Sequence, residues 1–181
     1  MAKVLVAGAS NVGKTSLVNS LVFQGFFHVS PTIGVNFAQK VCIGDAGPVS
    51  LSIWDLSGHS RFRCLMPRFC TGATGVMLVF DLNNPESLSK CAEWLNRISS
   101  YINPPTQYTA VLIGNKSDLP PQISPSEIEK FCNLYNISDY VQCSAKSGEN
   151  VKQAFETLCS AMQHNNPNLM ATSRIQIAEN P

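Results

Sequence analysis

The fold of this chain is decided by one stretch, Gly8-Ala9-Ser10-Asn11-Val12-Gly13-Lys14-Thr15. It has the form G-x-x-x-x-G-K-[ST] and joins an apolar run at 3–7, typical of a buried strand, to a stretch at 15–23 with apolar residues on one helix face. The backbone N–H groups of such a loop, with the positive end of the helix, bind phosphate. A glycine-rich turn with a chance lysine is the alternative, and the flanking strand and helix argue against it. The motif indicates a nucleoside triphosphate and leaves the base open.

Beyond this loop, apolar strands alternate with amphipathic helices. Strands are expected at 35–43, 49–54, 75–80, 110–114 and 140–143, and helices at 85–101, 125–135 and 150–162. Asp45-Ala46-Gly47-Pro48 predicts a hairpin between the second and third strands. We therefore expect an α/β domain over residues 1–163, with a six-stranded, mostly parallel sheet, one antiparallel edge strand and helices on both faces. Residues 164–181 lose helical periodicity and are expected to form a flexible tail.

Composition excludes several protein classes. The 181 residues suit one domain, and 44% hydrophobic with 14% charged residues argues against disorder. A net charge of +1 gives no general attraction to nucleic acid. The seven cysteines form no C-x-x-C pair, which favours free thiols in a reducing compartment over a zinc site or a disulfide framework. No apolar run reaches the roughly 18 residues of a membrane span, so we expect a cytoplasmic protein.

A second motif, Asp55-Leu56-Ser57-Gly58, directly follows a predicted strand. A carboxylate at a strand end can hold a magnesium-bound water, and a glycine lets its backbone N–H approach the γ-phosphate. Lys14 is expected to reach the β- and γ-phosphates, and the Thr15 hydroxyl to ligate Mg²⁺. The D-x-x-G pattern alone is weak evidence.

The base is indicated by Asn115-Lys116-Ser117-Asp118, which follows the strand at 110–114. One Asp carboxylate can accept both the N1–H and the exocyclic amine of guanine, a pair of donors that adenine does not offer. An ordinary strand-ending turn is the alternative for this motif alone. Ser144-Ala145-Lys146, after the last strand, can bring backbone groups to the base edge. All four motifs lie at carboxyl ends of predicted strands, where open α/β sheets bind ligands, so guanine nucleotide is the expected ligand.

With these motifs, the chain resembles the Ras superfamily of small GTPases from residue 3 to about 162, and most closely the Rab family. Pro31-Thr32-Ile33-Gly34-Val35-Asn36-Phe37 is similar to the family's switch I, and residues 54–63 are similar to its switch II. The Pro-Thr-Ile-Gly and Trp-Asp-Leu pieces also resemble Arf-type proteins. Arf is the second choice because the chain has neither an amphipathic leader nor a glycine at position 2.

The resemblance implies a P-loop small G domain that binds GTP or GDP with Mg²⁺ and acts as a molecular switch in membrane or intracellular trafficking. It assigns Phe27 to packing on guanine, and Phe37, Trp54 and Phe69 to an effector-binding aromatic triad; capping of the core is the alternative for these aromatics. The implied nucleotide-binding residues are Ser10, Asn11, Val12, Gly13, Lys14, Thr15, Ser16, Phe27, Thr32, Gly58, Asn115, Lys116, Asp118, Ser144, Ala145 and Lys146. The implied metal ligands are Thr15, Thr32 and Asp55, and the implied catalytic residues are Lys14, Thr32, Gly58 and His59.

The resemblance also implies effector partners at Thr32–Phe37 and Gly58–Phe69, an exchange factor and a GTPase-activating protein. We expect a monomer that does not bind nucleic acid. The chain as given has no C-terminal cysteine motif for a lipid anchor. A truncated sequence, a soluble protein and recruitment to membranes by a partner are the three readings of this feature.

His59 stands where most relatives carry the glutamine that orients the attacking water. Neutral imidazole can accept a hydrogen bond from water and protonated imidazole cannot, so we expect slow intrinsic hydrolysis that a partner stimulates. Translation-factor GTPases also use histidine at this place, and glutamine-like behaviour is the alternative. A hydrolysis-deficient GTP-binding scaffold is the rival function. The motif at 115–118 argues against an ATP-using kinase.

Overall fold

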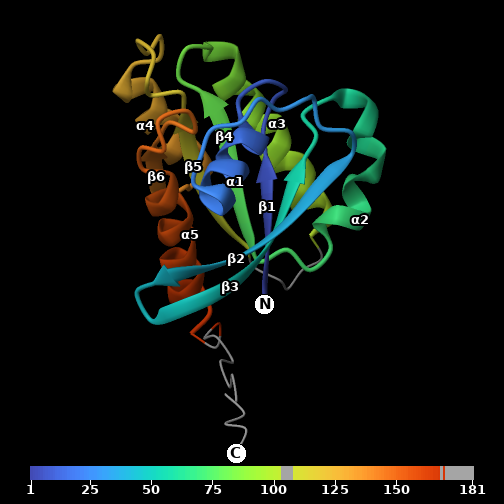
Figure 1. Ribbon diagram of the computed structural model, residues 1–181. Coiled ribbons are helices and arrows are strands. Elements are labelled where there is room, and N and C mark those ends of the chain that lie inside the picture. Colours follow the sequence, from blue (N-terminus) through green and yellow to red (C-terminus); the bar gives the residue numbers. More distant parts are fainter. Residues whose placement is uncertain (103–107, 168, 170–181) are drawn as a thin grey trace, which may run out of the picture.

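Six strands form one sheet in the order β2-β3-β1-β4-β5-β6 (Figure 1). The computed structural model describes residues 1–102, 108–167 and 169. Its strands are β1 (Ala2–Ala7), β2 (Val35–Gly44), β3 (Gly47–Leu56), β4 (Gly75–Asp81), β5 (Thr109–Asn115) and β6 (Asp139–Gln142). The β2–β3 pair is antiparallel and the other neighbours are parallel. The predicted α/β class, the six strands and the antiparallel edge strand are confirmed.

Helices cover both faces of the sheet, as expected (Figure 1). They are α1 (Lys14–Phe23), α2 (Met66–Cys70), α3 (Pro85–Tyr101), α4 (Pro125–Tyr135) and α5 (Val151–Asn165). Alternate residues of β1 supply two separate cores, since side chains of a strand point to opposite faces. Val4 packs with the α1 and α5 side of the sheet, and Leu5 with the α2, α3 and α4 side. The parallel strands thus read as continuous apolar runs because they are buried on both faces.

The segment between β3 and β4 contains helical structure that the sequence pattern did not reveal. A 3₁₀ turn at Ser60–Leu65 leads into the five-residue α2, where Met66 and Cys70 are buried. These helical turns are too short to show a helical period, and their apolar residues have no spacing to recognise. The segment becomes ordered by packing on the sheet rather than by helix propensity.

The final helix runs beyond the predicted end at 162. Gln163 is buried and binds the β2–β3 turn: its side chain donates to Gly47 O at 3.1 Å and accepts from Ala46 N at 2.9 Å. These contacts with a distant segment extend α5 to Asn165. The expected flexible tail at 164–181 lies for the most part outside the described residues. None of the described helices is both long and apolar enough to cross a membrane.

Candidate nucleotide-binding site

The predicted phosphate-binding loop lies between β1 and α1, with the backbone its sequence demands. Asn11 has φ 65° and Gly13 has φ 93°, left-handed conformations that Asn and Gly adopt more readily than other residues. Lys14 is buried, and its Nζ donates to Gly8 O at 3.0 Å and Ala9 O at 2.7 Å. Burial lowers the pKa of Lys14 to about 8, and the nearby Asp55 charge opposes this effect. The Lys14 ammonium group, held beside the backbone N–H groups of the loop, can bind the phosphates of a nucleotide.

A cavity of about 270 Å³ opens above this loop. Its wall combines the loop with two distant segments, one that ends at Thr32 and one that includes Gly58 and His59. The predicted phosphate, metal and catalytic residues therefore meet in one place. His59 is exposed at this cavity, where a side chain could face an attacking water.

Thr15, Thr32 and Asp55, which are the three predicted metal ligands, come together. The Thr15 Oγ1 donates to Asp55 Oδ2 at 2.5 Å and lies 2.7 Å from the Thr32 hydroxyl. Asp55 is buried, and its Oδ1 has no hydrogen-bond partner among the described residues. Burial raises the pKa of Asp55, while the Thr15 hydrogen bond and the Lys14 charge oppose this rise. A buried carboxylate oxygen without a partner, beside two hydroxyls, fits a hard cation such as Mg²⁺.

Gly58 and Gly34 join the two candidate switch segments to the phosphate-binding loop. Ser57 N donates to Gly34 O at 2.9 Å. Gly58 lies so close to the loop that a Cβ there would be 2.4 Å from Ser10 N. A side chain at position 58 would therefore push switch II away from the loop. This close approach explains why the motif after Asp55 requires glycine.

Asn115 connects the phosphate-binding and base-binding loops. Its Nδ2 donates to Val12 O at 2.8 Å, and its Oδ1 accepts from Ala145 N at 3.0 Å. The side chain is buried, and a Cβ on Gly13 would lie 2.3 Å from Asn115 Nδ2. Asn115 thus fixes the distance between the two loops, a positioning role that the motif alone did not reveal.

The remaining predicted guanine-binding residues also come together. The Ser144 hydroxyl donates to Asp118 Oδ1 at 2.6 Å and accepts from the backbone N–H groups of Lys146 and Ser147. One face of the Asp118 carboxylate is thereby fixed by Ser144. This arrangement can present the carboxylate to the paired N–H donors of guanine.

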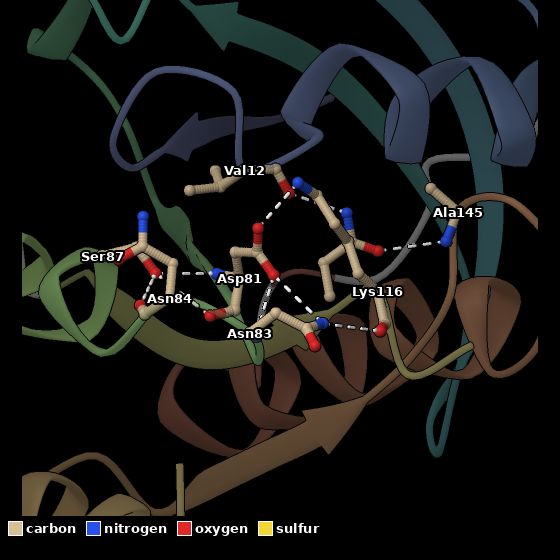
Figure 2. A network of polar contacts seen from close by, with 8 residues as sticks. Val12, Asp81, Asn83, Asn84, Ser87, Lys116 and Ala145 are labelled. Carbon is tan, nitrogen blue, oxygen red and sulfur yellow. Dashed lines mark hydrogen bonds and ion pairs between the residues drawn. The ribbon is translucent and has the colours of Figure 1, made fainter. Parts of the chain in front are cut away.

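Asp81 lies at this site, and the sequence analysis did not identify it. Its Oδ2 accepts from Lys116 Nζ at 2.7 Å, and its Oδ1 accepts from Asn83 N at 2.9 Å (Figure 2). Lys116 has φ 68°, so this ion pair orients a residue with an unfavourable backbone conformation. A signal was present, because Asp81 ends β4 at the same sheet edge as the four motifs.

The assignment of Phe27 to guanine packing is not supported by its surroundings. Its ring packs edge-on against Phe23, with centroids 6.0 Å apart. The neighbouring Phe26 instead lines a cavity together with Lys146 and Ser147 of the base-binding loop. Two adjacent phenylalanines made the sequence ambiguous, and the turn after α1 favours Phe26.

Phe37, Trp54 and Phe69 form the expected aromatic cluster. The ring centroids of Phe37 and Trp54 are 5.6 Å apart, and those of Trp54 and Phe69 are 5.8 Å apart. Phe37 is 55% exposed, whereas Trp54 and Phe69 are partly buried against the core. Lys3 Nζ lies 4.3 Å from the centre of the Trp54 ring. The cluster joins switch I to switch II on the side of the sheet covered by α2, α3 and α4.

Comparisons with known proteins identify the family of the chain. The Ras family model matches residues 3–164. The chain is 34% identical over 175 residues to Ras-related protein Rab-5B of Plasmodium falciparum, covering 91% of this chain and 83% of that protein. It is 37% identical over 161 residues to Ras-related protein Rab-7b of Mus musculus, covering 87% and 80%, respectively. It is 35% identical over 169 residues to the Ypt/Rab-type GTPase ypt7 of Schizosaccharomyces pombe, covering 90% and 82%.

The family match and these relatives lead to one conclusion. The chain belongs to the Ras family as a Rab-like small GTPase, a guanine-nucleotide switch of membrane trafficking that hydrolyses GTP to GDP and phosphate.

Proposed function

We propose that this GTPase depends on Mg²⁺ held at Thr15, Thr32 and Asp55. The supporting observation is the buried Asp55 carboxylate, whose Oδ1 lacks a partner among the described residues while two hydroxyls lie beside it. When bound, Mg²⁺ neutralises charge on the β- and γ-phosphates. Thr32 belongs to switch I, and its hydroxyl also lies beside Thr15 at the proposed metal site. Loss of the γ-phosphate would remove an interaction that holds switch I at this site, so residues 30–37 would sense which nucleotide is bound.

Guanine specificity is assigned to Asp118, with Asn115, Lys116, Ser144, Ala145 and Lys146 positioning it. The hydrogen bond from Ser144 leaves Asp118 Oδ2 available on the side away from that hydroxyl. Lys146 Nζ lies 3.8 Å from Asp118 Oδ2, so this ion pair holds the Lys146 side chain beside the carboxylate. Phe26 takes over the packing role first given to Phe27. Ser10, Val12, Gly13 and Ser16 supply the phosphate-binding backbone around Lys14 and Asn11.

Catalysis is assigned to Lys14, Thr32, Gly58 and His59. Gly58 lies against the phosphate-binding loop, so its N–H can approach the γ-phosphate. The exposed His59 has a ring nitrogen that can accept a hydrogen bond from the attacking water. An exposed side chain samples several orientations, which makes intrinsic hydrolysis slow until a partner orders it. A GTPase-activating protein would supply that order.

Partners are expected at the two switch segments, Thr32–Phe37 and Gly58–Phe69. Both contribute to the aromatic cluster, and Ser57 N and Gly34 O tie them together. A change in either segment is therefore transmitted to the cluster. Effectors would bind this surface, and an exchange factor would move the switch segments away from the nucleotide. We propose a cytoplasmic monomer that partners recruit to membranes.

The test is the nucleotide that co-purifies with the full chain, followed by single-turnover hydrolysis of loaded GTP. We expect GDP or GTP, with Mg²⁺-dependent retention. The rate should be below the ~10⁻⁴ s⁻¹ of a glutamine-bearing relative and should rise on His59→Gln. Bound adenine nucleotide, or retention unaffected by EDTA, would contradict the proposal.

A GTP-binding scaffold without meaningful turnover is the second candidate, favoured by His59 alone. It predicts that the wild-type protein leaves GTP unhydrolysed after prolonged incubation, even when the His59→Gln variant hydrolyses it. An ordinary wild-type rate would exclude both the scaffold and slow hydrolysis. Thr71→Ala, at an exposed position outside the cavity, serves as a matched surface control.

A further inference from the structure

Two buried cysteines, Cys42 and Cys159, interact where β2 packs on α5 (Figure 1). Cys42 is 4% exposed and Cys159 is 0% exposed, and both belong to the core on the α1 and α5 side of the sheet. Neither is among the nucleotide-binding residues assigned above. A single buried thiol acts as a small apolar group, but two thiols in one place can also be joined by a covalent bond.

The backbone geometry brings the two side chains together. Cys42 and Gly44 point to the same face of β2, because alternate residues of a strand share a face. A Cβ on Gly44 would lie 3.0 Å from the carbonyl carbon of Cys159, so this face of the strand lies directly on the helix. The β2–β3 turn binds Gln163 near the end of α5, so Cys42 lies toward the start of the helix. Helical side chains tilt in that direction, which points the Cys159 thiol toward Cys42.

Hydrogen bonds beyond the pair hold the strand against the helix. Asp45 N donates to Ser160 Oγ at 3.1 Å, and Ala46 N donates to the Gln163 side chain at 2.9 Å. Disulfides form only between backbone segments that already lie side by side, with Cα atoms roughly 4.4–6.8 Å apart. These contacts keep the two segments side by side while the thiols are free.

Cys42 is the sulfur that an oxidant would meet first. It lines the wall of a cavity of about 390 Å³, together with Lys40. A water molecule takes up about 30 Å³ in the liquid, so the cavity admits a small oxidant such as hydrogen peroxide. Hydrogen bonding with Cys159 lowers the pKa of Cys42, which burial opposes, and the same interaction raises the pKa of Cys159. Cys42 is therefore the more readily ionised member of the pair, and the thiolate is the reactive form.

We propose that Cys42 and Cys159 form a reversible disulfide site, which hydrogen peroxide oxidises and a thiol of the glutathione class reduces. The Cys42 thiolate attacks one peroxide oxygen, the O–O bond breaks, and Cys42 becomes a sulfenic acid while the departing hydroxide takes up a proton to form water. The Cys159 sulfur then attacks the Cys42 sulfur, so that an S–S bond forms, the S–O bond breaks, and the hydroxyl leaves as a second water with the Cys159 proton. The two sulfurs together lose two electrons, which the peroxide gains. Two glutathione molecules reverse the change by successive thiol–disulfide exchange and leave as their own disulfide.

The disulfide would have two effects on the protein. It would protect Cys42 from further oxidation to sulfinic and sulfonic acids, which is irreversible for most proteins. It would also close a loop over residues 42–159, and a cross-link over a long loop restricts the unfolded chain. Transient disulfides of this kind occur in reducing compartments, where they sense oxidants. The site does not depend on the proposed nucleotide-binding roles.

The test treats the GDP-loaded full chain with hydrogen peroxide, blocks the remaining thiols with N-ethylmaleimide and maps tryptic peptides by mass spectrometry. Trypsin releases peptides 41–61 and 153–174, which contain Cys42 and Cys159, respectively, as their single cysteine. We expect these two peptides to be joined, with the loss of the two thiol hydrogens, and reduced glutathione to separate them. The oxidised protein should melt at least about 4 °C above the reduced protein, because the cross-link restricts the unfolded chain.

Variants of single cysteines provide the controls. Cys42→Ala and Cys159→Ala should each abolish the cross-link and the rise in Tm. Cys91→Ala is the matched control and should keep both, because Cys91 is also 0% exposed but belongs to the core on the other side of the sheet. Peptide mapping of the wild type decides the matter even where a variant fails to fold. Seven thiols that all survive peroxide, a cross-link through the exposed Cys64 instead, a 42–159 bond that forms only in urea, or an oxidised Tm no higher than the reduced one would overturn the proposal.

Discussion

Replacing Asn115 by alanine should disconnect the two nucleotide-binding loops. The substitution leaves Val12 O and Ala145 N without their hydrogen bonds of 2.8 and 3.0 Å in a buried site. Each buried group without a partner costs about 1–3 kcal/mol, so the nucleotide-free protein should lose about 2–6 kcal/mol of unfolding free energy. For a domain of this size, each kcal/mol lowers the Tm by about 2–4 °C. The expected loss is at least about 4 °C.

Thermal unfolding followed by circular dichroism, after removal of nucleotide, measures this loss, and calorimetry measures GDP affinity. The Kd should rise at least about tenfold, because the loops are no longer held at the spacing that guanine and phosphate require. Asn83→Ala is the control: that half-buried side chain makes only long hydrogen bonds of 3.4 Å within the same network. It should shift the Tm by about 1–2 °C. An Asn115→Ala protein that melts within 1 °C of wild type would refute the reasoning.

Three other outcomes follow from single side chains. Asp118→Asn should favour xanthine over guanine nucleotides in competition binding, because an amide can accept from N1–H and donate to a 2-oxo group; unchanged guanine preference would count against the role of Asp118. Tyr140→Phe should raise stability by about 1 kcal/mol in urea unfolding, since the buried Tyr140 hydroxyl has no partner among the described residues. Burial also raises the pKa of Tyr140 to about 12, so the unfolded chain loses this proton first and wild-type stability should fall between about pH 10 and 12. Tyr140→Phe should lack that part of the fall, and equal pH profiles would contradict the argument. Because the pKa of Lys14 is about 8 without nucleotide and phosphate favours its protonated form, GDP binding at about pH 9 should take up a proton. Calorimetry in two buffers of different ionisation enthalpy checks this uptake, which the permanently charged Lys14→Arg should lose.

The sequence pointed to segments that meet in the fold where a motif combines with its place at a strand end. Thr15, Asp55 and Asn115 were found this way, and the sheet brings their segments together as expected. Asp81 was missed because its place at a strand end came without a motif, and its ion pair with Lys116 exists only in the folded chain. Phe27 was preferred over Phe26 because two adjacent aromatics look alike in sequence. The turn that follows α1 alone decides which ring lies near the base-binding loop.

Two other differences have the same origin. The helix α2 is five residues long, below the length at which periodicity can be detected. The end of α5 depends on Gln163, whose partners lie in the β2–β3 turn more than a hundred residues away. Neither feature has a local signal. Contacts across the fold create both.

By itself the sequence determined the alternation of strands and helices, the phosphate-binding loop and the guanine motif. Those features depend on local backbone needs, hydrophobic period and hydrogen-bonding chemistry, which neighbouring residues supply. Only the tertiary structure decided that Asn115 spans the two loops, that Gly58 touches the phosphate-binding loop and that Cys42 of β2 lies beside Cys159 of α5. Each of these is a distance between segments far apart in the chain. Packing fixes such distances, and no local pattern encodes them.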